Sequence, residues 1–559
     1  MVQEALPTSE PLTPGTAPAA RDSRESLVRH AAVMTTGTAL SRLTGFLRLS
    51  AMTAALGVTV SSLGSIYTVA NLTPNIVFEL ILGGILTSVF VPVFVDRLET
   101  KGPEDARHVV EGVITLVLAL TILVAVLAAI FAEQIIRLYL VASDRPHPAE
   151  IELGVFLLRW FMPQIVFYGV GAVAIGLLQA HRRFAPPMFA PILNNLVVMG
   201  TFVAYAIVRA GRPPRVVGIT TTEKTILGAG TTLGVVVMTA ALWPSLRSLG
   251  YRLRVRMGWR HEAVRRLVRL AGWVALYVAV NQLAYVVVIV LNNRFDAGPQ
   301  IYTTAFTVFQ LPHAIFAVSI FTALLPGMSE RWATGDPDGV RAFASRGLRD
   351  TAVITLPAAL GLIVLAEPIV RLLFEHGAAQ PADTVQIART LQGFAAGLLF
   401  FSAFQLLTRT FYAMQDTRTP ALVNVGAAVV NVAAAFLFIG AIGPFDLGLR
   451  GMAIAHATSY VVGSSLLFVL LRRRLGALDE AAIARTVGKA ALAALLAAAA
   501  ALVVVRAWGV ARDASVSLQT AQVGAAILAG VLVFLVSALI LRLGEVDDLR
   551  RALLRRFRG

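Results

Sequence analysis

Two arginines interrupt an apolar stretch near the N-terminus, in the segment SRLTGFLRL. Guanidinium groups bind phosphate and carboxylate oxygens through paired hydrogen bonds, so Arg42 and Arg48 are candidates for holding an anionic ligand. On an α-helix their side chains lie within an arc of about 120° and about 9 Å apart along the axis. Gly45 lies between them and leaves a notch, and Thr38 and Ser41 extend the same polar face.

The two arginines differ in how deep they lie in this stretch. Arg48 lies closer to an end and can reach the lipid headgroups by snorkelling, which is the alternative to a binding role. Arg42 lies near the middle, where inserting an arginine costs about 2.5–3.5 kcal/mol. An arginine in that position is expected to face a cavity and to have a carboxylate or an anionic substrate as its partner.

Glu79 is the one carboxylate near the middle of a predicted span, in the segment NLTPNIVFELILGG. We expect it to face the same cavity, where it either pairs with Arg42 or Arg48 or titrates as the protein works. One guanidinium is then still available for a substrate, and a diphosphate has suitable oxygens. Asn75 belongs to the same segment and is a further candidate for the substrate site.

The second half of the chain offers amides where the first offers cations. Asn281 and Gln282 lie in one apolar stretch, and Gln310 and His313 lie in the next. Each amide either contacts a substrate or forms a hydrogen bond between helices, and His313 either joins helices or relays protons. We expect the Asn194–Asn195 pair to hold helices together.

The composition indicates which elements position these side chains. The chain has 559 residues, of which 57% are hydrophobic and 14% charged, whereas a soluble domain is about 45–50% apolar and about 25% charged. Many apolar blocks approach the roughly 20 residues that a membrane-spanning helix needs. The sequence predicts an all-α polytopic membrane protein with 14 spans, at residues 31–56, 64–95, 108–132, 151–180, 186–208, 225–246, 264–292, 301–328, 350–374, 386–413, 420–441, 448–471, 483–505 and 520–542.

The basic residues are distributed unevenly between the two sides of these spans. The tails and the loops after even-numbered spans contain 32 Lys and Arg residues, whereas the loops after odd-numbered spans contain 10. The positive-inside rule therefore predicts a multi-pass protein with both termini in the cytoplasm. Topology thus accounts for the net charge of +16, and we expect no nucleic-acid partner. The absence of cysteine excludes disulfides and thiolate metal sites, and we expect no metal and no cofactor.

Two pairs of short segments recur at an offset of 234 residues, which indicates an internal repeat. PVFVDR matches PGMSER, and HRRFAP and QDTRTP both end in proline at that offset. Six helices is an even number, so two such units have the same orientation and predict two lobes in parallel pseudo-repeat around a central cavity. The expected parts are a disordered cytoplasmic tail at 1–30, an N-lobe at 31–246, a basic linker at 247–263, a C-lobe at 264–475, two extra helices within 483–543, and a basic cytoplasmic tail at 544–559.

The same segments resemble the MurJ (MviN) family of lipid II flippases. SRLTGFLR resembles the SR-x-x-GF-x-R signature of that family's first helix, and RRFAPPMFAPILNN resembles its RF-x-x-P-x-FAP-x-L-x-N stretch. FYAMQDTRTP is similar to its FY-x-x-QD-x-x-TP loop, and LPHAIFAVSIFTALLPGMS matches its eighth helix in outline. The chain is most similar to the actinobacterial branch, and the resemblance extends from residue 31 to residue 475.

This resemblance implies a multidrug/oligosaccharidyl-lipid/polysaccharide exporter fold with alternating access of two lobes around a cationic cavity. It implies that Arg42 and Arg48 take the roles of the family's first-helix arginines, and that helices 13 and 14 form a groove for the lipid tail. The sequence departs from the family in lacking cavity arginines in helices 2 and 8, and Glu79 stands where a basic residue is expected.

The sequence predicts a transporter rather than an enzyme, because it contains no P-loop, no HExxH and no nucleophile–base set. The resemblance implies a flippase that moves lipid II, a polyprenyl-diphosphate glycolipid and peptidoglycan precursor, from the cytoplasmic to the outer leaflet of the bacterial cytoplasmic membrane. Cell-wall synthesis proteins are candidate partners. The alternatives are an exopolysaccharide-lipid flippase or drug/cation antiporter of the same superfamily, or a non-transporting membrane scaffold for cell-wall enzymes.

Overall fold

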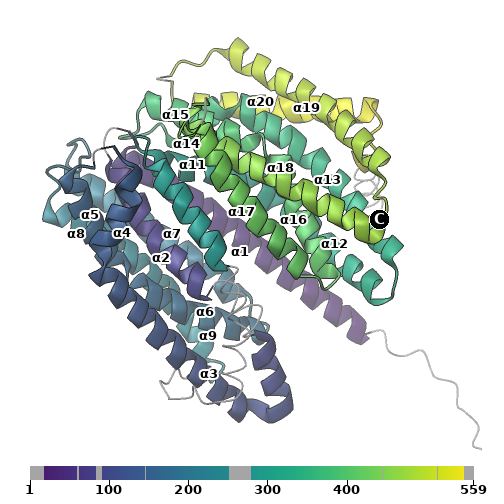
Figure 1. The fold of residues 1–559 in the computed structure, drawn as a ribbon, viewed down its shortest axis with the longest axis horizontal. Coiled ribbons are helices and arrows are strands. Elements are labelled where there is room, and N and C mark those ends of the chain that lie inside the picture. The colour runs from purple at the N-terminus through teal and green to yellow at the C-terminus, as the bar shows by residue number, and fades with distance from the viewer. Residues whose placement is uncertain are drawn as a thin grey trace, which may run out of the picture.

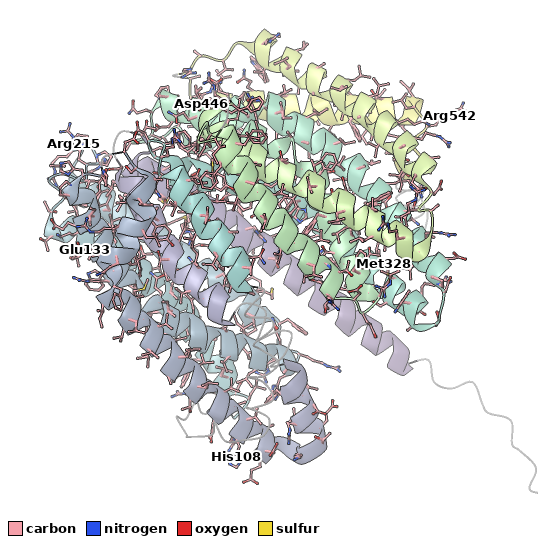
Figure 2. The ribbon with its side chains drawn as sticks, viewed as in Figure 1. His108, Glu133, Arg215, Met328, Asp446 and Arg542 are labelled. Carbon is pink, nitrogen blue, oxygen red and sulfur yellow. The ribbon has the colours of Figure 1, made fainter. Side chains whose placement is uncertain are left out.

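The protein is all-α, as the composition predicts (Figure 1). The computed structural model describes residues 18–59, 62–82, 91–144, 146–250, 278–442, 445–512 and 514–546. Within these ranges the only β-pairing is one isolated bridge between Ile439 and Asp446, the latter labelled in Figure 2.

Helices follow one another with short connections throughout these ranges. The first half contains α1 (Pro18–Leu56), α2 (Leu63–Leu82), α3 (Val91–Ile130), α4 (Ala132–Tyr139), α5 (Pro148–Phe161), α6 (Gln164–Ala180), α7 (Ala185–Arg209), α8 (Thr221–Ala240) and α9 (Trp243–Arg247). The second half contains a helix at Val278–Asn292, then α11 (Gly298–Pro312), a π-helical turn η3 (His313–Ala317), α12 (Val318–Ala333), α13 (Pro337–Val364), α14 (Ala366–Phe374), α15 (Pro381–Ala395), α16 (Leu398–Ala413), α17 (Arg418–Phe438) and α18 (Gly448–Leu475). The last two helices are α19 (Glu480–Trp508) and α20 (Val516–Ile540).

The described helices include 10 that are long and apolar enough to cross a membrane, or 11 if the bent pair α15 and α16 forms one span. Helices lie within all of the predicted ranges. However, α1, α2 and the helix Val278–Asn292 are not among those spans. Charged and amide side chains interrupt the apolar sequence of α1 and α2. The helix Val278–Asn292 is short, and residues 251–277, which precede it, lie outside the described part. The number of 14 spans therefore stays a prediction.

The helices gather into two lobes, with the last two helices beside the second lobe. In the first lobe α7 packs on α8, and in the second lobe α17 packs on α18. In Figure 1 the blue helices α3 to α9 form one group and the green helices α11 to α18 form another. The yellow helices α19 and α20 pack on each other, and α19 also packs on α13. The buried face of α19 consists mainly of alanines, and such small side chains let helices approach closely where no water drives their association.

The repeated loops have the same backbone geometry in both lobes. Arg182 and Gln415, which lie 233 residues apart, one fewer than the offset of the sequence repeat, both have a positive φ, of 57° and 58°. The backbone N–H of the next residue donates to the carbonyl five residues earlier, at 2.8 Å in the first lobe and 2.9 Å in the second. This pattern closes the preceding helix in the same way twice and supports the parallel repeat.

The arginines of the other repeated segment each have an acidic residue nearby, but at positions that do not correspond, eight residues after Arg97 and five residues after Arg331. Arg97 Nη1 lies 4.0 Å from Asp105 Oδ2, and Arg331 Nη1 lies 2.7 Å from Asp336 Oδ2. Asp336 also accepts a hydrogen bond from the N–H of Gly339 at the start of α13. The bonds from Gly339 and Arg331 hold the pKa of Asp336 below its usual range.

The N-terminal tail differs from the prediction of disorder over 1–30, because α1 begins at Pro18. The segment that follows, AARDSRESLVRH, contains two Ala and three Arg, which are good helix formers, and proline suits the first turn. The rest of α1 is already helical, so adding residues at its N-terminal end does not require the unfavourable nucleation of a new helix. Residues 1–17, residues 251–263 of the predicted linker and residues 547–559 lie outside the described part, and the domain boundaries stay predictions.

Candidate functional site

Helix α1 carries the two arginines and runs along the boundary between the lobes, with its longest contact on α7 (Figure 1). Arg42 is exposed and Arg48 is partly exposed. Neither side chain forms an ion pair with any residue that the structure describes. Thr38 is also exposed, and its hydroxyl lies 3.7 Å from the sulfur of Met188 on α7. That Arg42 faces a cavity and binds a ligand stays a prediction.

The glycine notch between the arginines receives a side chain of α7. A Cβ atom on Gly45 would lie 3.5 Å from Nδ2 of Asn195. The same Nδ2 donates to the carbonyl oxygen of Ser41 at 3.2 Å and to the hydroxyl of Thr44 at 3.0 Å. Gly45 and Ser41 thus seat α7 on α1, and the expectation that Asn195 holds helices together is confirmed. A direct role of Gly45 and Ser41 in binding stays a prediction.

Glu79 lies near the end of α2 and is exposed. Within the described residues it forms no ion pair, so the pairing with Arg42 or Arg48 is absent from this structure. The reason is that α1 packs along α7 and has little contact with α2. Asn75, one turn earlier, donates from Nδ2 to the carbonyl of Asn71 in its own helix at 3.0 Å. That Glu79 and Asn75 belong to the substrate site stays a prediction.

The two arginines act on different lobes. Arg48 lies within electrostatic range of Tyr67 and Tyr168, both in the first lobe. Arg42 lies within electrostatic range of His313 in the second lobe, and so does Arg409 of α16. The α1 helix therefore presents Arg42 towards the second lobe, near a further cation.

Arg409 is the residue that sequence reasoning missed. It is partly exposed, and its guanidinium lies over the ring of Phe321 at 4.9 Å from the centroid. The signal was present, because Arg409 lies inside a predicted span just as Arg42 does. What the sequence did not show is that the charges of Arg409 on α16 and Arg42 on α1 both act on His313.

The polar residues of the second lobe mostly join helices. Nδ2 of Asn424 on α17 donates to Oδ1 of Asn281 at 2.6 Å, and both residues line a pocket of about 180 Å³. Nδ1 of His313 lies 2.9 Å from the hydroxyl of Ser402 on α16. Gln282 and Gln310 are partly exposed, and within the described ranges their side chains form no hydrogen bond. Both glutamines thus remain candidates for contact with a substrate.

The lobes meet at the end where α1 stops. The N–H of Thr59 donates to Oδ1 of Asp383 at 3.0 Å, and the Thr59 hydroxyl donates to the same oxygen. Nε2 of Gln300 donates to the carbonyl of Gly57 at 2.8 Å. Asp383 and Gln300 are buried, so these bonds are shielded from water. We name this set of interactions the inter-lobe contact.

Backbone and ring contacts complete the inter-lobe contact. The N–H of Ala378 donates to the carbonyl of Ala54 at 2.8 Å. Gly377 has a φ of 62°, and a Cβ there would lie 2.5 Å from the same carbonyl, so glycine is required. The ring centroids of Phe46 and Phe374 lie 5.4 Å apart. Among described residues every hydrogen bond between the lobes belongs to this end, and the ribbons of the lobes diverge towards the other (Figure 1).

Comparison with known sequences identifies relatives over most of this chain. The sequence profile of the family "Lipid II flippase MurJ" matches residues 52–515, a range that begins just after the two-arginine segment. A probable lipid II flippase MurJ of Rhizobium meliloti (strain 1021) is 28% identical over 446 residues, covering 80% of this chain and 81% of the relative. The lipid II flippase MurJ of Burkholderia cenocepacia is 26% identical over 443 residues, covering 78% and 82%.

Solved structures share the fold. A lipid II flippase MurJ in an inward closed conformation superposes with a TM-score of 0.73 at 21% identity, covering 91% of this chain and 98% of that one. An inward-facing multidrug resistance MATE transporter of the MOP superfamily has a TM-score of 0.63 at 15% identity, covering 78% and 95%. Because the family profile spans most of the sequence and the two-lobed helical fold agrees with it, the chain belongs to the lipid II flippase MurJ family.

Proposed function

We propose that this chain moves lipid II from the cytoplasmic to the outer leaflet of the bacterial cytoplasmic membrane. The observation that carries the proposal is an exposed arginine near the middle of α1, in a chain that belongs to the lipid II flippase MurJ family. Lipid II joins its sugar to its lipid through a diphosphate, and a guanidinium supplies two parallel donors to such an anion.

The diphosphate is held from both lobes. Arg42 contributes from α1 and Arg409 from α16, since both lie in range of His313. Arg48 lies on the side of the first lobe and adds positive charge deeper along α1. Charge–charge attraction is strong in a site away from bulk water, so few cations suffice. The polyprenyl tail stays in lipid beside α19 and α20, whose exposed side chains include Leu492, Leu528 and other large apolar groups.

Transport proceeds by rocking of the lobes about this site. The inter-lobe contact closes the end of the molecule where α1 stops, and α1 begins at the opposite end. If the termini are cytoplasmic, as the distribution of Lys and Arg predicts, this conformation receives substrate from the cytoplasm. Opening of the inter-lobe contact, with closure of the other end, then releases it outward. Substrate drives the exchange by binding the two conformations with different affinities.

The structure gives less support to the alternative functions, a drug/cation antiporter and a non-transporting scaffold. A drug/cation antiporter concentrates cations in its site, and Arg42 and Arg409 repel them. A non-transporting scaffold has no use for an arginine whose insertion costs about 2.5–3.5 kcal/mol.

The test is reconstitution of the full chain into proteoliposomes with fluorescent lipid II in one leaflet. We expect lipid II to reach the other leaflet faster than in protein-free vesicles, with a fluorescent phosphatidylcholine unaffected. Uptake of a cationic dye is measured in the same vesicles. Dye transport without lipid II transport supports the antiporter and refutes the proposal, and transport of neither supports the scaffold.

A further inference from the structure

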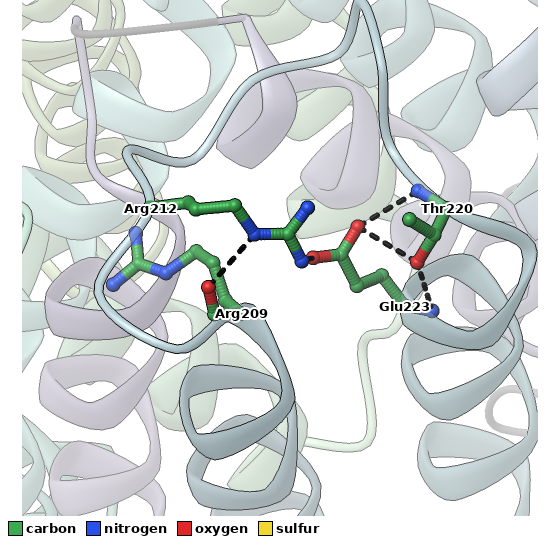
Figure 3. Close-up of polar contacts among 4 residues, drawn as sticks. All are labelled: Arg209, Arg212, Thr220 and Glu223. Atoms are coloured by element: carbon green, nitrogen blue, oxygen red, sulfur yellow. Dashed lines mark hydrogen bonds and ion pairs between the residues drawn. The ribbon is translucent and has the colours of Figure 1, made fainter.

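A second cationic site lies where α7 ends and α8 begins, apart from Arg42 (Figure 3). It is a pocket of about 370 Å³ whose lining includes Arg209, Arg212, Arg215 and Glu223. The loop that forms it packs beside the inter-lobe contact, since a Cβ on Gly57 would lie 3.5 Å from the ring of Pro214 in this loop. The pocket therefore opens on the face opposite to the start of α1.

The single carboxylate of the lining is already engaged. Oε1 of Glu223 lies 2.7 Å from Nη2 of Arg212. Oε2 accepts from the N–H of Thr220 at 2.7 Å and from the Thr220 hydroxyl at 3.0 Å (Figure 3). Arg212 also donates from Nε to the carbonyl of Arg209 at 3.0 Å. Glu223 and Arg212 thus neutralise each other and fix the loop on α8.

Two positive charges remain in the pocket. Nε of Arg209 is buried and has no hydrogen-bond partner among the described residues, and its guanidinium lies 6.0 Å from the ring centroid of Tyr205. Arg215 is exposed and forms no ion pair within the described part of the chain. A buried donor without a partner is costly, and an anion that accepts from it removes that cost.

The surroundings of the pocket are apolar and exposed. On α7, Val203 and Ile207 are 55% and 71% exposed, and in the loop Val217 is 62% exposed. Since α7 has the length and composition of a membrane span and Arg209 is its last residue, we infer that Val203 and Ile207 face lipid near the end of the span. The pocket therefore lies at the level of the headgroups, where lipid phosphates are found.

The placement of the charges is unusual for this face. The loops after odd-numbered spans contain 10 Lys and Arg residues, and four of them, Arg209, Arg212, Arg215 and Lys224, belong to this one connection. The positive-inside rule disfavours basic residues on the outer side. Within the described residues two of these four are paired, Arg212 with Glu223 at 2.7 Å and Lys224 with Glu152 at 3.3 Å, whereas Arg209 and Arg215 form no ion pair.

We propose that the Arg209–Arg215 pocket binds the phosphate group of a lipid in the outer leaflet. Arg209 and Arg215 hold the phosphate oxygens, and the acyl or prenyl chains lie along the exposed apolar side chains of α7. The lipid is either an anionic phospholipid or a polyprenyl diphosphate, which share this chemistry. The proposal does not depend on which lipid the chain transports.

The test measures lipid binding to the purified full chain by native mass spectrometry. The probes are phosphatidylglycerol, phosphatidylcholine with the same acyl chains, and a polyprenyl diphosphate. The variants are Arg215→Gln and the double variant Arg209→Gln/Arg215→Gln. The matched control is Arg512→Gln, which removes an exposed arginine that is paired with Glu367 at 2.6 Å. Thermal unfolding is recorded for each, and Arg215→Gln alone carries the test if the double variant does not fold.

We expect the wild-type chain and the Arg512→Gln control to prefer an anionic probe over phosphatidylcholine. We expect the Arg215→Gln or double variant to bind that probe at least about tenfold more weakly. A loss confined to phosphatidylglycerol identifies bulk phospholipid as the source, and a loss confined to the diphosphate identifies the polyprenyl lipid. Equal binding of both anionic probes by wild type and variants overturns the proposal.

Discussion

Removing one hydroxyl from the inter-lobe contact should shift the protein towards a conformation that is open at this end. The hydroxyl of Thr59 donates to Oδ1 of Asp383, and these two residues belong to different lobes. Thr59→Val deletes this donor and keeps the shape of the side chain. The bond from the Thr59 N–H to the same oxygen is unaffected by the change.

The size of the shift follows from the environment of the acceptor. Asp383 is 1% exposed, so water and salt screen its charge little. A hydrogen bond to a charged group contributes about 1.5–3 kcal/mol. Because this bond exists only while the lobes touch, its whole value is lost from the closed conformation. The ratio of open to closed molecules should then rise roughly 10- to 150-fold.

Double electron–electron resonance spectroscopy, which measures distances between two spin labels, reports the ratio of open to closed molecules. The chain has no cysteine, so labels can be attached to cysteines introduced at Thr222 and Gln386, which are exposed and belong to different lobes. Thr307→Val is the control, since the Thr307 hydroxyl donates only within its own helix, at 2.8 Å. We expect longer distances in Thr59→Val alone. An unchanged distance distribution in Thr59→Val refutes the inference that this contact holds the end closed.

Asn195→Ala should lower the thermal stability of the purified protein, because it removes the two hydrogen bonds from the Asn195 side chain to α1, at a cost of about 1–3 kcal/mol. An unchanged melting temperature contradicts this role. Because the pKa of Asp336 is lower in the folded protein than in the unfolded chain, the ionised carboxylate stabilises the fold. This stabilisation is complete above the usual pKa of about 4 and is lost as the pH falls through the pKa of Asp336 in the folded protein. Asp336→Asn should therefore melt below wild type at pH 7 and approach it near pH 3, and a pH-independent difference contradicts the assignment. A cysteine at Ser248 should resist an impermeant reagent added outside intact cells, and its labelling there reverses the topology.

The sequence revealed the class and repeat of this fold because their signals are local. Apolar blocks predict spans wherever they lie, and the repeated HRRFAP and QDTRTP loops end the preceding helix with the same backbone hydrogen bond in the two lobes. Arg42 stood out because a charge inside an apolar stretch needs an explanation. These features depend on few contacts with distant parts of the chain, so they can be predicted from the sequence alone.

Contacts between distant segments did not show in the sequence. Asn195 fits the notch of Gly45 only because α7 packs along α1, more than 100 residues away. Thr59 and Asp383 lie near helix ends and look like ordinary capping or loop residues, although they join the lobes. The expected partner of Glu79 failed for the same reason, because neighbours along the chain do not determine which helices pack together.

The most direct test of the account is the rate of lipid II flipping by Arg42 variants in proteoliposomes, divided by the amount of folded protein. Arg42→Ala should fold, because removal of a mid-membrane charge relieves an insertion cost of about 2.5–3.5 kcal/mol and no ion pair with a described residue is lost. We predict that Arg42→Ala abolishes flipping and that Arg42→Lys restores it only in part, because an ammonium lacks the planar pair of donors. Normal flipping per folded molecule of Arg42→Ala would contradict the claim that α1 binds the diphosphate.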